Sequence, residues 1–139
     1  MEARVKWVEQ RTFVGESGSG HSVVMDGAPD AGGRDLGVRP MEMLLLGMGG
    51  CTAFDVVDIL RKGREPVEDV VIELSGERSG EIPKVFTRID VKYIVTGRGL
   101  NPDKVERAVH LSAEKYCSAT IMMGATAEIT HTIEIVEAG

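Results

Sequence analysis

Two cysteines are the side chains of this sequence best suited to chemistry. Cys51 and Cys117 are the two cysteines of the sequence, and they lie 66 positions apart. The sequence has no CxxC pair and none of its three histidines stands at ligand spacing, so the pattern disfavours zinc, and we expect no metal and no cofactor. From the residues alone, two free thiols are either inert core groups, because an unpaired cysteine packs like a small apolar side chain, or redox-active groups.

Three glycines, Gly47, Gly49 and Gly50, come directly before Cys51 in a stretch of helical character. Each glycine in a helix interior costs about 1 kcal/mol relative to alanine, so three together need a reason. One reason is close packing of a neighbouring helix or strand. The other is that a reactant must reach the Cys51 sulfur past a bare backbone. The two reasons are compatible.

Two arginines, Arg34 and Arg39, come from a polar, glycine-rich loop over residues 28–39. An arginine next to a thiol favours the thiolate and so lowers the pKa of that thiol. This loop is therefore the place to look for a group that activates a cysteine. The alternative is that both arginines are surface charges that face water.

Length and charge limit the possible functions. The 139 residues are typical of one domain, which we expect to span 1–139. A net charge of −6 argues against binding to nucleic acid. We see no signal peptide and no apolar run of about 20 residues, so we expect a cytoplasmic protein that does not enter a membrane. Cysteines in that compartment are more often free, metal-bound or redox-active than part of a structural disulfide.

The longest predicted element is a helix over 40–63, which carries Cys51. Proline suits its first position, and Gly63 followed by Pro66 suits its end. Its first half is apolar on nearly every side and should be buried all round. A second helix over 102–116 begins at an Asn-Pro pair and ends next to Cys117, and one more helical turn is expected over 118–123.

Alternating apolar and polar residues predict strands over 3–8, 12–14, 21–25, 70–74, 85–96 and 127–135. A strand with one polar, solvent-facing side and one apolar side is typical of antiparallel sheets that are covered on one face. His131 lies on the apolar face of the last strand, where we expect a hydrogen-bonded core histidine. The fold class that follows is α+β.

Several separated segments together resemble the OsmC/Ohr family. They are Pro40-Met41-Glu42-Met43-Leu44, then Gly49-Gly50-Cys51 with eleven positions from proline to cysteine, and Ala113-Glu114-Lys115-Tyr116-Cys117. The agreement extends over essentially the whole chain, and the opening MEARVKWVEQ and the segment SAEKYCS are most similar to the YhfA-type branch. The resemblance implies an OsmC-like fold, in which antiparallel sheets surround a long central helix and two subunits intertwine as a homodimer.

The function implied by this resemblance is a thiol-dependent peroxidase that reduces organic hydroperoxides in oxidative stress defence. By analogy, Cys51 is the attacking thiolate and Cys117 resolves its sulfenic acid as a disulfide, which a dithiol reductant then reduces. Glu42, Arg39 and Arg34 are the candidates for tuning the thiolate. Glu42 matches the second acidic position of some members, because Met41 follows the proline where the peroxidase branches have glutamate. Neither arginine falls in the register of the family's activating arginine.

Two other functions fit the same residues. One is a non-catalytic dimer of this fold that binds a small hydrophobic or thiol ligand. The other is a structural dimer whose cysteines only fill the core. Oxidation of the two thiols by an organic hydroperoxide separates the first function from these two.

Overall fold

The computed structural model describes residues 1–139 and divides them into two compact units, Met1–Leu44 and Leu45–Gly139. The first unit holds an antiparallel sheet of β1 (Ala3–Glu9), β2 (Thr12–Ser17) and β3 (Ser22–Met25), followed by a short 3-10 turn at Pro29–Ala31. The first three strands predicted from the sequence are therefore confirmed, and they form an antiparallel meander.

A buried carboxylate organises the end of the first unit. Asp26 accepts hydrogen bonds from the Thr12 hydroxyl at 2.8 Å and from the backbone N–H groups of Gly27, Arg34 and Leu36. Burial disfavours the charged carboxyl, but these hydrogen bonds together outweigh it and lower the pKa of Asp26. The Asp26 side chain thus ties the polar loop after β3 to the sheet.

The second unit contains a mixed sheet in the order β4 (Val67–Arg78), β5 (Phe86–Gly97), β6 (Glu128–Glu137). β4 and β5 pair antiparallel, whereas β6 runs parallel to β5, so the expectation of purely antiparallel sheets is wrong for this pair. The physical reason is the connection. Residues 102–123 form α2 (Pro102–Leu111), a π-helical turn called η2 (Ser112–Tyr116) and α3 (Ser118–Met123). A helical crossover of this length returns the chain in the same direction.

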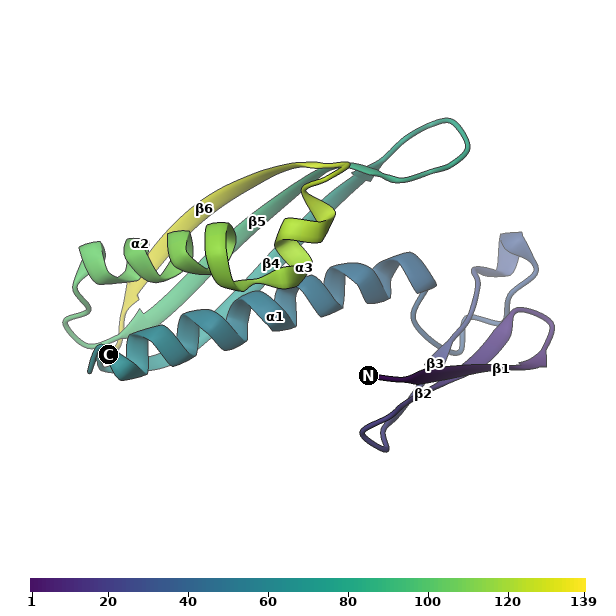
Figure 1. Cartoon of the computed structure of the whole chain (residues 1–139), viewed down its shortest axis with the longest axis horizontal. Helices are drawn as coiled ribbons and strands as arrows, with labels where there is room; N and C mark the ends of the chain where they lie inside the picture. The colour runs from purple at the N-terminus through teal and green to yellow at the C-terminus, as the bar shows by residue number, and fades with distance from the viewer. The chain divides into compact units, whose positions relative to one another are not determined.

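Helix α1 (Pro40–Lys62) begins in the first unit and continues into the second (Figure 1). Its buried positions follow one stripe, Met48, Thr52, Val56 and Leu60, which repeats every four residues. These residues share the core of the second unit with the inward side chains of β5 and α2, namely Ile89, Val91, Tyr93, Val95, Val105 and Val109. Figure 1 shows α1 and the α2–α3 segment running alongside the sheet.

Two expectations about α1 are corrected. Its first half is not buried all round, because Leu44 and Leu46 are 47% and 56% exposed in the single chain. By length and composition alone α1 could also cross a membrane, with a mean hydropathy of 1.7 over 18 residues, although the sequence was expected to hold no such run. A central core helix satisfies the same criteria, and the buried stripe of α1 gives it that role here.

Candidate functional site

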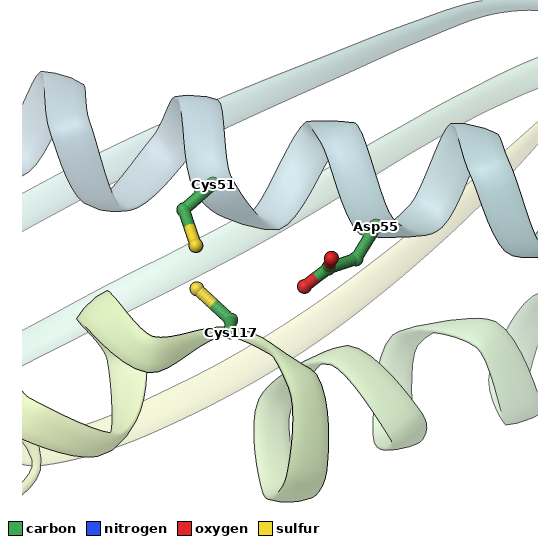
Figure 2. Close-up of side chains that lie close together, drawn as sticks. All are labelled: Cys51, Asp55 and Cys117. Atoms are coloured by element: carbon green, nitrogen blue, oxygen red, sulfur yellow. The ribbon is translucent and has the colours of Figure 1, made fainter.

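The two cysteines lie together although they are 66 positions apart in the sequence. Both are free thiols, Cys51 half-buried on α1 and Cys117 fully buried between η2 and α3. Their sulfur atoms and a carboxylate oxygen of Asp55 all lie within 4.8 Å of one another. Figure 2 shows the two sulfurs pointing toward each other, with the Asp55 carboxylate beside them.

Helix geometry accounts for two members of this group. Cys51 and Asp55 are four positions apart on α1, so they lie one turn apart on the same face. The Asp55 carboxylate accepts a hydrogen bond from the Ser112 hydroxyl at 3.0 Å, which joins α1 to the first residue of η2. The i and i+4 spacing of Cys51 and Asp55 is visible in the sequence and could have indicated this pairing.

The π-helical turn positions the third member. η2 follows directly on α2, and the backbone N–H of Cys117 donates to the Ser112 carbonyl at 2.8 Å, which closes the wide turn. Cys117 then adopts an extended conformation before α3, and its sulfur accepts from the Thr120 N–H at 3.4 Å. Single π turns inside helices frequently mark functional positions. Here the turn aims the Cys117 side chain at α1.

Two threonine hydroxyls complete the surroundings of the Cys117 sulfur. Thr120 Oγ1 donates to it at 3.1 Å, and Thr52 Oγ1 lies 3.4 Å from it and 3.3 Å from Thr120 Oγ1. All three side chains are buried. No local sequence pattern predicts this cluster, because it depends on the packing of α1 against α3.

The two thiols differ in acidity. Burial raises the pKa of Cys51, and the contact with Cys117 and the negative charge of Asp55 raise it further. Burial also disfavours a thiolate at Cys117, but hydrogen bonds from Thr120, Thr52 and Cys51 outweigh it and lower the pKa of Cys117. Within one chain the more acidic thiol is thus Cys117, whereas the family resemblance assigned the thiolate to Cys51.

The other three predicted site residues belong to the first unit and have contacts there. Arg34 donates to the Thr12 hydroxyl at 2.9 Å and pairs with Glu9 at 3.5 Å. Arg39 pairs with Asp35 at 2.8 Å. The Glu42 carboxylate accepts from the Arg39 N–H at 2.7 Å, so it caps the start of α1.

The three glycines before Cys51 have different surroundings. A Cβ on Gly49 would lie only 2.8 Å from Leu74 Cδ1, whereas a Cβ on Gly47 or Gly50 would meet no atom within 4 Å. Close packing therefore explains Gly49 alone. Gly50 lines an apolar hollow of about 460 Å³ together with Ala53, Phe54, Val57, Asp58 and Arg61.

Comparison with known proteins identifies the family. Residues 32–132 match the family described as OsmC-like protein. The chain belongs to the OsmC-like family. It is 53% identical to Protein YhfA of Escherichia coli strain K12 over 138 residues, which are 99% of this chain and 100% of that protein.

Solved structures of other proteins share the fold. A hypothetical protein from Aquifex aeolicus is 30% identical, with a TM-score of 0.87 over 99% of this chain and 97% of that one. An organic hydroperoxide resistance protein OsmC from Legionella pneumophila is 16% identical, with a TM-score of 0.71 over 96% of this chain and 95% of that one. At that identity the likeness concerns the fold alone.

Proposed function

We propose that this OsmC-like protein is a cytoplasmic thiol-dependent peroxidase that reduces organic hydroperoxides in oxidative stress defence. The observation that carries the proposal is the pair of free cysteines, whose sulfurs face each other at no more than 4.8 Å. Two thiols at that separation are suited to forming a disulfide, which is the oxidised product that such a reaction needs.

Accessibility assigns the first step to Cys51. A hydroperoxide must touch the sulfur that it oxidises, and Cys51 is half-buried whereas Cys117 has no exposed surface. Cys51 loses its proton to water, and the resulting thiolate attacks the distal oxygen of the hydroperoxide. The O–O bond breaks, Cys51 becomes a sulfenic acid, and the alkoxide takes one proton from water and leaves as the alcohol.

Cys117 then attacks the sulfenic sulfur of Cys51, so that a disulfide forms and one water molecule leaves. A dithiol reductant donates two electrons and two protons and restores both thiols. The apolar hollow beside Gly50 and Phe54 offers a surface for the alkyl group of the hydroperoxide. As expected from the sequence, Arg39 or Arg34 is proposed to supply the positive charge that activates Cys51, with Glu42 as the carboxylate that positions the arginine.

We propose that the protein acts as a homodimer. In the single chain α1 exposes Leu46 and Phe54, at 56% and 75%, and these large apolar side chains would be covered by a second copy. Sedimentation of the reduced protein tests this, and a monomer at micromolar concentration would contradict it.

Mass spectrometry after treatment with cumene hydroperoxide tests the reaction. We expect a Cys51–Cys117 disulfide in the wild type and a trapped sulfenic acid on Cys51 in Cys117→Ser. Cys51→Ser should abolish peroxide turnover and leave the oligomeric state unchanged. Peroxide consumption that survives in Cys51→Ser would show that the role given to Cys51 is wrong. A slower disulfide formation in Arg39→Gln or Arg34→Gln would identify the activating arginine.

One observation favours a second function, a binding module without turnover. The negative charge of Asp55 beside Cys51 raises the pKa of that thiol and so opposes the nucleophile that a peroxidase needs. A binding module would hold a small hydrophobic or thiol ligand next to unreactive cysteines. Thiols that stay unmodified under excess hydroperoxide, together with a co-purifying ligand, would select this function.

A further inference from the structure

Asp55 has no role in the proposed peroxidase reaction, yet it completes a group of three metal-binding side chains. The Cys51 sulfur, the Cys117 sulfur and an Asp55 carboxylate oxygen each lie within 4.8 Å of the other two. The two ligands on α1 stand at i and i+4, the helical spacing with which paired ligands hold zinc in metalloproteases. Cys117 approaches from the opposite side, as Figure 2 shows.

The chemistry of this group suits a cation. The two thiols lose their protons when a metal ion binds, and the three side chains then carry three negative charges in a partly buried site. Asp55 takes part in none of the protein's ion pairs, and its hydrogen bond comes from the neutral hydroxyl of Ser112. A bound metal ion would remove the mutual repulsion of the three deprotonated ligands.

We propose that reduced Cys51, Asp55 and Cys117 bind a Zn²⁺ ion, with water as the fourth ligand. Two thiolates select a thiophilic cation, and three protein ligands with one open position are a common zinc arrangement. Zn–S bonds of about 2.3 Å place tetrahedral sulfurs about 3.8 Å apart. In this structure the two sulfurs lie within 4.8 Å of each other, a limit about 1 Å longer than the distance in a zinc site. Rotation of the Cys51 side chain can bring the sulfurs that much closer.

Neighbouring groups suit the site. The Ser112 hydroxyl orients the Asp55 carboxylate, and the Thr120 hydroxyl does the same for the Cys117 sulfur. A cleft of about 580 Å³ between α1 and α2 reaches Asp55, and its lining also includes Tyr116, Lys62 and Arg107.

The site links metal binding to the redox state of the cysteines. Binding releases the two thiol protons and holds both sulfurs as thiolates. An organic hydroperoxide would oxidise the pair to a disulfide, consume two protons, release one alcohol and one water, and expel the ion. Zinc therefore binds only the reduced protein. This inference needs the three ligands to be close together and does not need the peroxidase activity.

Cobalt absorption tests the site. The reduced protein is freed of metal and titrated with Co²⁺ without oxygen. We expect a thiolate-to-cobalt charge-transfer band that saturates at one ion per chain and disappears when Zn²⁺ is added. Cys51→Ser and Cys117→Ser should lose most of the band. Asp55→Asn should weaken Co²⁺ binding about tenfold or more, because it loses a charged ligand. Circular dichroism confirms that each variant is folded.

Asp58→Asn is the matched control, because Asp58 lies on the same helix and pairs with Lys62 at 2.8 Å. Its Co²⁺ affinity should equal that of the wild type. Ser112→Ala keeps all three ligands and should weaken binding less than Asp55→Asn. The proposal is overturned if the wild type gives no charge-transfer band, if Asp55→Asn binds as tightly as the wild type, or if the oxidised protein binds Co²⁺ equally well.

Discussion

Replacing Asp55 by asparagine removes one negative charge next to the cysteine pair while preserving the shape of the side chain. The asparagine oxygen can still accept from the Ser112 hydroxyl. In the wild type the Asp55 charge contributes to the raised pKa of Cys51, so the substitution should lower that pKa and increase the fraction of thiolate at neutral pH. We therefore expect the variant to react faster with a hydroperoxide.

The size of this effect follows from the distance. At a separation of 4.8 Å, two unit charges repel by about 3.5 kcal/mol at an effective dielectric constant of about 20. Because Asp55 is only half-buried, water and salt screen part of this repulsion. We expect the screened repulsion to be about 1.4 kcal/mol. Its loss in Asp55→Asn corresponds to a rate increase of about tenfold.

Single-turnover reaction of the reduced protein with cumene hydroperoxide measures the change. A metal chelator is present throughout, so that Asp55 acts only through its own charge. The pH–rate profile of Asp55→Asn should move to lower pH, whereas Glu134→Gln should match the wild type because Glu134 lies on β6 and pairs with Lys92. An unchanged reaction of Asp55→Asn would refute the electrostatic reasoning. A slower reaction would also refute it and would indicate that Asp55 handles a proton.

Three further predictions concern stability. Gly50→Ala should raise the free energy of unfolding by about 1 kcal/mol, because its Cβ meets no atom. Gly49→Ala should gain less stability than Gly50→Ala, or lose stability, because its Cβ would crowd the Leu74 side chain. Urea unfolding measures both variants. Leu60→Ala, at a position 1% exposed, should cost about 2–5 kcal/mol in the same assay. The lowered pKa of Asp26 stabilises the fold above its unfolded-state pKa of about 4, and this is lost as pH falls through the folded value. Thermal melts of Asp26→Asn should show a weaker acid dependence.

Local patterns predicted most of the secondary structure. Alternation located the strands, and the Asn101-Pro102 pair located the start of α2, where the Asn101 side chain accepts from the Asp103 N–H at 3.0 Å. The parallel pairing of β6 was missed, because alternation fixes the faces of a strand and not its direction. That residues 1–139 form one domain stays a prediction.

The site was less accessible to sequence reasoning. From the residues alone, Cys51 and Cys117 could be either inert or reactive thiols. Only the family resemblance indicated that they act as a pair. The acidity of Cys117 depends on hydroxyls contributed by Thr52 and Thr120, which meet only after α1 and α3 pack. His131 was expected in the core, and its ring does bond the buried Tyr93 hydroxyl at 2.7 Å, yet the side chain stays exposed.

The position of Cys117 on the crossover between β5 and β6 has a thermodynamic consequence. A disulfide between Cys117 and Cys51 would join this crossover covalently to α1 and close a ring of 67 residues. Loop-closure entropy assigns about 4 kcal/mol to such a ring. By linkage, the native fold would favour its oxidised state over that of the unfolded polypeptide by the same amount, equivalent to about 90 mV of reduction potential. The position of Cys117 in the fold thus contributes to the reduction potential that an electron donor needs in order to reduce the disulfide.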